Sequence, residues 1–257
     1  MMKKYIVIVS DCTDVAYNEM RAKILHEIDN EKIKNNIIVE PLVPAKEFSI
    51  INGAFLVRLM ADLYPPKNTI FLVVINPCKI RPARLIGETN NGFKFVAANT
   101  GTINWLISDF GLKNLYELKN CGFFPFGGKF VHAPATAKLA LGKNFDELGE
   151  KRDKNFLVNF HIPDGTVVHI DNFGIIKIKG KPPNYDDGDV LEIYINGKKR
   201  LDAIFTHRMM SLDDGVWALY PGSSLGGMPE LGKVRSLNGA DEIDVNIGDM
   251  IRWKKKT

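Results

Sequence analysis

The sequence has few cysteines, and they are not spaced to bind a metal or to form a disulfide framework. Cys12, Cys78 and Cys121 are the only cysteines among 257 residues, an odd number without a CxxC pair. Disulfide-stabilised proteins and zinc modules use paired or closely spaced cysteines. We therefore expect no disulfide framework and no metal site, and a reducing cytoplasmic environment.

Long apolar runs are also missing. A helix that crosses a bilayer needs about 20 consecutive apolar residues, and no segment of this sequence approaches that length. Lys3 and Lys4 precede the short apolar run 5–9, which is typical of a strand rather than of a signal peptide. We expect no membrane contact.

The sequence shows no strong excess of one charge. It has 34 basic and 30 acidic residues, a net charge of +4, and its one dense basic run is 252–256. A terminal run of this kind is usually a solvated end, so we expect no nucleic-acid partner. Hydrophobic residues make up 45% of the chain and charged residues 25%, which is typical of an ordinary globular protein with a full core.

The first part of the chain alternates strand-like and helical patterns. Apolar, β-rich runs occupy 5–9, 37–43, 70–75, 93–97 and 115–118. Apolar residues at helical spacing occupy 15–28, 50–63 and 134–141. This alternation predicts an N-terminal α/β domain with a mainly parallel sheet over residues 1–155.

The pattern changes after about residue 160. Short runs follow one another at 166–170, 175–178, 191–195, 203–205, 216–220, 243–245 and 250–253. Turn pairs such as Asn196-Gly197 and Asp214-Gly215 separate several of them. This half predicts a small C-terminal all-β barrel over residues 156–257, with the domain boundary in the charged stretch 147–155.

A first candidate site lies at Ser10-Asp11, directly after the first apolar run. Open α/β sheets bind ligands at the carboxyl ends of their strands, so Asp11 is a candidate ligand-binding group. The alternative is an N-cap for the helix that follows, since Asp is favoured there for backbone reasons alone.

Several further segments, in order along the chain, match the motifs of one family. They are Ser10-Asp11 followed by Asp14 and Met20, residues 44 and 53–55, residues 64–71 (YPPKNTIF), residues 126–128 with 133–134 and 139–142, and residues 170–174 (IDNFG). Together they resemble the family of SAM hydroxide adenosyltransferases, which cleave S-adenosylmethionine (SAM) and are related to the fluorinating and chlorinating SAM enzymes. The resemblance extends over nearly the whole chain.

The resemblance implies both an activity and a set of site residues. It implies an α/β domain joined to a β-barrel, and cleavage of SAM to adenosine and methionine by water attack at the ribose C5′, with SAM as substrate and no further cofactor. In the family pattern Asp11 holds the ribose diol, Asp171 and Phe173 lie on the adenine side, and Phe48 packs beside the sulfonium. The family also implies a homotrimer, in which each site lies between the N-terminal domain of one subunit and the β-domain of the next.

The catalytic motif of the family is not preserved. Asn76 stands at the position of its aspartate, Ala83 at that of its arginine with Arg84 one step on, and Gly127 at that of its histidine. An amide cannot accept a proton from water as a carboxylate does. We expect Asn76 and Arg84 to position water in a rearranged catalytic set; the alternative is a non-catalytic adenosine- or nucleotide-binding protein with the family fold.

Other site residues keep two interpretations. Asp171 is also the residue that a plain Asp-Asn-Phe-Gly turn favours, and Phe48 also fits an ordinary core. Gly128 replaces the serine of halogenating members, so a halide pocket is not expected. His132 is expected to be packed or at the surface rather than catalytic.

Basic residues around the expected site suggest a different ligand. Lys79, Arg81, Arg84 and Lys129 cluster near its predicted mouth, and extra positive charge disfavours the sulfonium cation of SAM. They indicate an adenosine-type ligand with an anionic end, unless they are solvent-facing loop charges. The same basic residues would favour a thiolate at Cys12 or Cys78, although small buried thiols are the commoner case.

Overall fold

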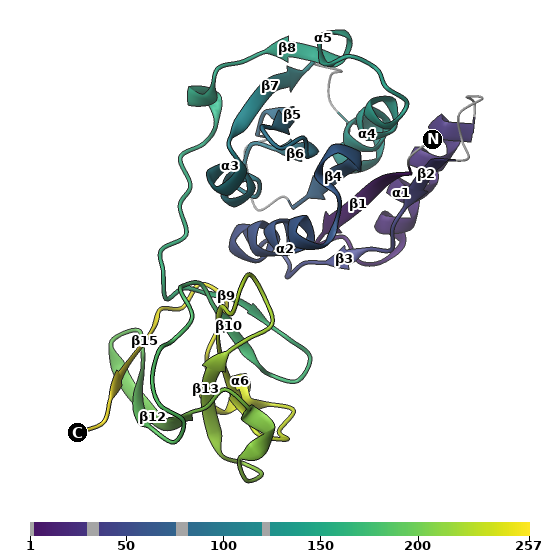
Figure 1. Cartoon of the computed structure of the whole chain (residues 1–257). Coiled ribbons are helices and arrows are strands. Elements are labelled where there is room, and N and C mark those ends of the chain that lie inside the picture. The colour runs from purple at the N-terminus through teal and green to yellow at the C-terminus, as the bar shows by residue number, and fades with distance from the viewer. Residues whose placement is uncertain (1–2, 30–35, 76–81, 120–123) are drawn as a thin grey trace. The chain divides into compact units, whose positions relative to one another are not determined.

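The computed structural model describes residues 3–29, 36–75, 82–119 and 124–257. The chain divides into two compact units, Met1–His161 and Ile162–Thr257, each with its own sheet and hydrophobic core (Figure 1). The first unit is α/β and the second is all-β, which confirms the predicted fold class. Among the described residues, no helix is long and apolar enough to cross a membrane.

The first unit is built on a mixed sheet with strand order β2-β1-β4-β6-β5-β7-β8, and β3 also pairs with β1. Its strands are β1 (Lys4–Ser10), β2 (Ile37–Val39), β3 (Val43–Pro44), β4 (Thr69–Val74), β5 (Arg84–Thr89), β6 (Lys94–Ala98), β7 (Leu112–Leu118) and β8 (Gly149–Lys151). Strand β1 pairs in parallel with β2, β3 and β4, and β4 with β6. The remaining pairs, β5 with β6 and β7, and β7 with β8, are antiparallel.

Helices cover both faces of this sheet (Figure 1). They are α1 (Val15–Asp29), α2 (Ile50–Leu63), α3 (Asn104–Phe110), α4 (Ala133–Ala140) and α5 (Phe145–Leu148). Helices α1 and α4 contact each other, as do α2 and α3. Because both faces of the central strands are covered, these strands have continuous rather than alternating apolar sequences.

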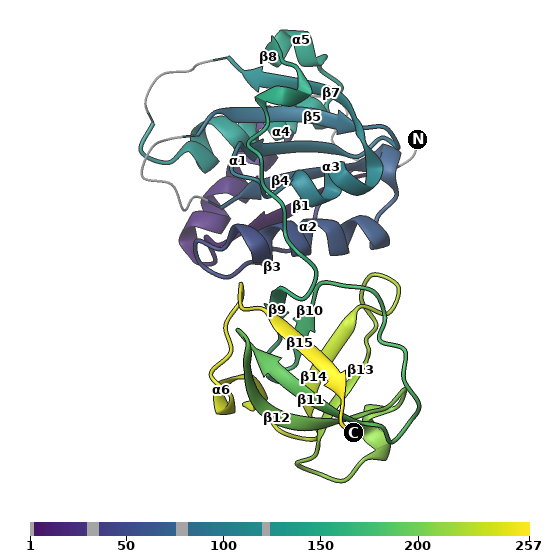
Figure 2. The same cartoon turned by 90° about the vertical axis from the view of Figure 1, so that its left-hand side faces the viewer.

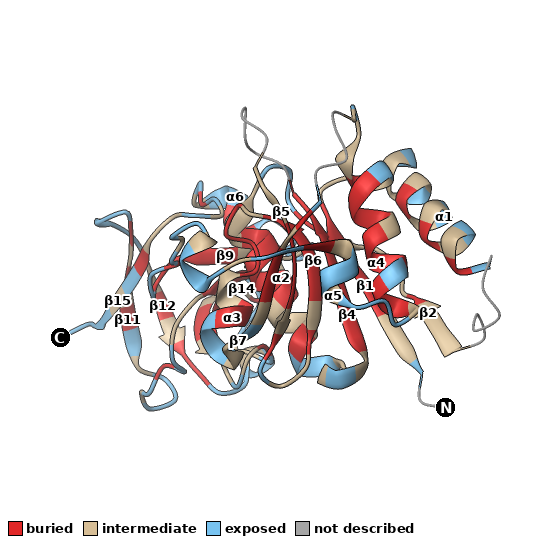
Figure 3. Cartoon of the chain, turned by 90° about the horizontal axis from the view of Figure 1, so that it is seen from above, coloured by how far each residue is buried: buried red, intermediate tan, exposed pale blue. Residues whose placement is uncertain are grey.

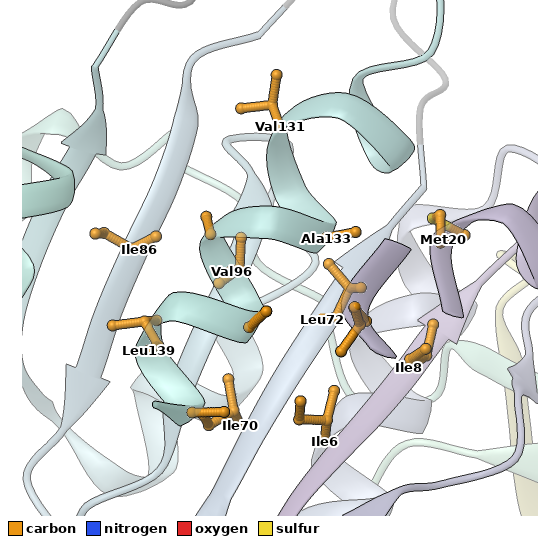
Figure 4. Close-up of a cluster of buried hydrophobic side chains, with 14 of the residues drawn as sticks. Ile6, Ile8, Met20, Ile70, Leu72, Ile86, Val96, Val131, Ala133 and Leu139 are labelled. Carbon is orange, nitrogen blue, oxygen red and sulfur yellow. The ribbon is translucent and has the colours of Figure 1, made fainter. Parts of the chain in front are cut away.

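One face of the sheet forms a core with α1 and α4. Ile6 and Ile8 of β1 and Leu72 of β4 lie there against Met20 of α1 and Leu139 of α4 (Figure 4), and all five are at most 1% exposed. Figure 3 shows the same concentration of buried residues along the central strands. Burial of this kind stabilises a fold by about 1.5–3 kcal/mol per large apolar side chain.

The second unit is a single sheet with order β15-β11-β12-β13-β14-β10-β9 (Figure 2). Its elements are β9 (Val167–Ile170), β10 (Ile176–Ile178), β11 (Val190–Ile195), β12 (Lys198–Phe205), β13 (Trp217–Pro221), β14 (Pro229–Lys233), α6 (Gly239–Glu242) and β15 (Ile251–Lys255). All pairs are antiparallel except β12 with β13. The sheet curls until its two ends meet, since Thr166 bridges Met250 and the Val167 N–H donates to the Asp249 carbonyl at 2.8 Å.

The predicted strand 243–245 is wrong. These residues follow α6 as a turn and a loop, although Val245 is 4% exposed and Ile243 contacts the core. Their apolar character therefore reflects packing into the core from a loop. The predicted run 37–43 is split between β2 and β3, and the sequence pattern did not reveal β5, α3 or β14.

The basic C-terminal run is matched by acidic residues on neighbouring strands. Lys254 pairs with Glu192 at 3.1 Å, Lys255 with Asp189 at 2.7 Å, and Lys256 with Asp202 at 2.5 Å. Glu192 also accepts a hydrogen bond from Lys199 at 2.7 Å. These donors lower the pKa of Glu192 to about 2, with Lys199 as the largest cause.

The lowered pKa of Glu192 predicts a pH-dependent contribution to stability. A carboxyl group with a depressed native pKa stabilises the fold above its unfolded pKa of about 4.3, and this stabilisation disappears as the pH falls through its native pKa. We therefore expect Glu192→Gln to lower the melting temperature at pH 7, and the difference from wild type to vanish between about pH 4.3 and pH 2. Thermal unfolding of both proteins across this range tests the prediction, and a difference that is independent of pH contradicts it.

Candidate functional site

A cavity of about 180 Å³ lies at the edge of the first sheet where the parallel strands end. Asp11 follows β1, Ile75 follows β4, and Arg84 begins β5 opposite Ala98, the last residue of β6. This antiparallel pairing brings the start of β5 to the same edge as the ends of its parallel neighbours. The lining residues are Asp11, Cys12, Val74, Ile75, Pro82, Arg84, Ala98, Pro125, Phe126, Gly127, Gly128 and His132.

Asp11 is held by a short network between strands. The buried Ser10 hydroxyl donates to the Val74 carbonyl at 2.8 Å and accepts from the Cys12 N–H at 3.0 Å. The N-cap of α1 is Asp14, whose Oδ1 accepts from the Ala16 N–H at 3.0 Å. Asp11 is therefore not the cap of this helix, and it lies in the wall of the cavity.

Phe48 is tied to Asp11 through its backbone. Its N–H donates to Asp11 Oδ2 at 3.0 Å, and its φ of 57° is in the left-handed region that aromatic residues rarely adopt. Its side chain is 70% exposed, so it does not belong to the core. An exposed aromatic ring on strained backbone is characteristic of binding sites. The ring is not part of the cavity wall.

Arg84 fills the space beside Gly127. An ideal Cβ on Gly127 would lie 3.3 Å from Arg84 Nη2 and 3.7 Å from Nε. At Gly128 the same Cβ would lie 2.8 Å from the Met20 sulfur and 2.8 Å from the Phe126 ring. The guanidinium group thus occupies the place next to residue 127, and residue 128 has no room for a side chain.

These contacts predict opposite outcomes for two neighbouring substitutions. Gly128→Ala forces a methyl group against Met20 and Phe126, and overpacking of this kind costs about 1–3 kcal/mol. Gly127→Ala meets the flexible end of Arg84 instead, so we expect its free energy of unfolding to stay within about 1 kcal/mol of wild type. Urea unfolding of the two variants measures the difference; equal destabilisation would contradict this account of the site.

Two further groups in the cavity wall carry chemistry. His132 is 6% exposed and ends a π-turn, Gly128–His132, that leads into α4. It is buried in the cavity wall, which the sequence did not indicate. Burial raises the pKa of the Cys12 thiol, against a smaller opposing effect of Ser10. Cys12 is therefore a neutral thiol rather than an activated nucleophile.

The expected cluster of cations is reduced among the described residues. Lys129 pairs with Glu19 at 2.6 Å, and its ammonium group lies 5.0 Å from the centroid of the Phe130 ring. Arg84 is in the cavity wall. Asn76, Cys78, Lys79 and Arg81 lie outside the described residues. Within the part of the chain that the structure describes, no group of three or more His, Cys, Asp or Glu side chains is placed to hold a metal ion.

The other two predicted site residues belong to the second unit. Asp171 follows β9, and its Oδ1 accepts from the N–H groups of Phe173 at 2.9 Å and Ile175 at 3.0 Å. Gly174 completes this turn with a φ of 74°. Asp171 thus has the turn-forming role that its sequence allows, and it presents Phe173 with a ring that is 54% exposed.

Comparison with known proteins identifies a family and a fold. A model of the SAM hydroxide adenosyltransferase N-terminal domain matches residues 6–149. A solved structure of an uncharacterized conserved protein from Thermotoga maritima is similar with a TM-score of 0.81 and 20% identity, covering 97% of this chain and 100% of the other. A conserved hypothetical protein from Thermus thermophilus gives 0.75 and 19%, covering 99% and 100%. No curated protein matches the chain.

Proposed function

Because the chain belongs to the SAM hydroxide adenosyltransferase family, whose members use SAM, we propose that it cleaves SAM to adenosine and methionine. Water attacks the ribose C5′, the C5′–S bond breaks, and its electron pair passes to the sulfur. The observation that carries this proposal is the cavity at the ends of β1 and β4, where Asp11 and Arg84 meet. SAM is the substrate, and the reaction uses no further cofactor.

Asp11 binds the ribose in this proposal. A carboxylate has two oxygens with about four acceptor positions, and the Phe48 N–H uses one of them. The others are available to the two ribose hydroxyls. The same hydrogen bond couples Asp11 to the segment that carries Phe48, whose exposed ring suits the positive sulfonium of SAM.

Arg84 and Asn76 position the attacking water. A guanidinium group offers five N–H donors in a fixed plane, and Arg84 presents its group to the cavity over Gly127. The Asn76 amide both donates and accepts, so it orients water without taking a proton from it.

We propose that three copies of the chain assemble, with Asp171 and Phe173 of one subunit on the adenine side of the next subunit's site. The exposed ring of Phe173 supports this role, since aromatic faces stack on bases. Analytical ultracentrifugation tests the assembly, with an expected mass of three times the 28.8 kDa chain. A mass of one chain contradicts it.

A second candidate function is binding of adenosine or a nucleotide without catalysis. It is favoured by Gly127, which offers no side chain beside Arg84, and by Asn76 in place of a carboxylate.

Two measurements separate the two candidate functions. A ligand that binds only the native state raises thermal stability by mass action, so melting temperatures with SAM, adenosine and AMP rank the ligands. Chromatography of SAM incubated with the protein then detects products. Equal amounts of adenosine and methionine support the enzyme, intact SAM with a clear stabilisation supports the binding protein, and no stabilisation with intact SAM contradicts both.

A further inference from the structure

The proposed reaction needs a group that accepts a proton from water, and the cavity wall offers few. Four of its described lining residues have titratable side chains: Asp11, Cys12, Arg84 and His132. A general base must be neutral or anionic, must carry a lone pair, and must face the reacting water.

Three of the four are poorly suited to this role. Arginine has no acceptor atom and stays protonated in proteins. Burial raises the pKa of the Cys12 thiol, so it is not the thiolate that a base requires. Asp11 accepts the Phe48 N–H and, in the proposed function, also holds the ribose.

His132 has a suitable side chain and is positioned by the backbone around it. The Ala133 N–H bonds to the Gly128 carbonyl, which closes the π-turn, and Thr136 Oγ1 donates to the His132 carbonyl at 2.8 Å. Such single π-turns occur frequently at functional sites, because the extra residue re-aims the side chains around it. His132 is 6% exposed, so its place in the cavity wall is fixed by packing.

We propose that His132 is the catalytic general base of this protein; this assignment rests on the proposed function. As the water oxygen bonds to C5′, one water proton passes to an imidazole nitrogen of His132. The C5′–S electron pair goes to sulfur, which becomes the neutral thioether of methionine, and the new hydroxyl belongs to adenosine. The imidazolium then releases its proton to solvent.

The charges around the cavity are consistent with a neutral imidazole that gains a proton. Arg84 faces the cavity from β5 and Asp11 from the end of β1. Lys129, on the same turn as His132, is paired with Glu19 of α1. A proton acquired by His132 thus appears in the same cavity as the Asp11 carboxylate, and opposite charges stabilise each other.

Two variants of His132 test the assignment. His132→Gln keeps a polar side chain of similar size but removes the base, and general base catalysis contributes about 100- to 10,000-fold. We expect kcat to fall by a factor in that range while KM for SAM changes little. His132→Ala leaves a space of the size of the lost ring, and added imidazole is expected to restore part of its kcat. His26→Ala, which removes an imidazole from α1 of the same unit, is the control and keeps wild-type activity.

The outcomes distinguish this assignment from the proposed function. Adenosine formed by wild type, lost in both His132 variants and restored by imidazole supports His132 as the base. A kcat near wild type in His132→Gln, or no restoration of His132→Ala by imidazole, overturns the assignment while the proposed function stands. If His132→Ala does not fold, the Gln variant alone decides. Wild-type protein that leaves SAM intact overturns the proposed function, and the assignment with it.

Discussion

Asp11→Ala is expected to lower kcat/KM for SAM cleavage by at least about 100-fold, because hydrogen bonds to a charged group contribute about 1.5–3 kcal/mol each. The substitution removes the acceptor for two ribose hydroxyls. It also removes the acceptor for the Phe48 N–H, which helps to hold residue 48 at its strained φ of 57°. Steady-state kinetics with SAM, with chromatographic detection of adenosine, measures the effect.

Asp14→Ala is the matched control for this experiment. Asp14 lies three residues further along the same loop and caps α1 through the Ala16 N–H. Loss of an N-cap costs about 1 kcal/mol of stability, so this variant should melt earlier and keep its kcat/KM. A similar loss of activity in both variants would show that loop stability, rather than ribose binding, accounts for the effect of Asp11.

Glu230→Ala is expected to destabilise the second unit by about 3 kcal/mol, since removing one partner of a buried ion pair leaves the other charge uncompensated. Glu230 bonds to Lys177, and their side chains are 7% and 13% exposed. Lys177 lies opposite Glu230 in the β10–β14 pair, and Tyr220 lies opposite Glu230 in the β13–β14 pair. Burial, together with the Glu230 carboxylate, raises the pKa of Tyr220, so the hydroxyl stays protonated beside Glu230.

Urea unfolding followed by tryptophan fluorescence measures this loss, because Trp217 and Trp253 belong to the second unit. Glu242→Ala is the control: Glu242 is paired with Lys233 of β14 but is 42% exposed. Exposed pairs contribute about 0–1 kcal/mol. Equal destabilisation by the two substitutions would contradict the distinction between the buried and the exposed pair.

The sequence predicts the fold where burial is continuous. The runs at 5–9 and 70–75 correspond to β1 and β4, whose residues are largely buried on both faces. Prediction fails where tertiary contacts override the local pattern. Strand β14 contains Pro229 and Gly232, which are disfavoured in strands, and is nevertheless buried between two neighbours. The apolar residues at 243–245 fill the core from a loop.

The site is predictable only in part for a similar reason. Asp11 follows from the rule that ligands gather at strand ends, and the structure places it in the cavity wall. The proximity of Arg84 to Gly127 is not visible in the sequence, because it depends on the antiparallel β5 returning to the same edge. His132 is hidden because a π-turn, rather than an ordinary helical turn, sets its position.

Cleavage of SAM in water enriched in ¹⁸O tests the central claim most directly. Mass spectrometry of the products reports which carbon the water attacks. Attack at C5′ predicts adenosine with one ¹⁸O in its 5′-hydroxyl and an equal amount of methionine without the label. Intact SAM, or products in which the 5′-hydroxyl of adenosine does not carry the label, would contradict the account.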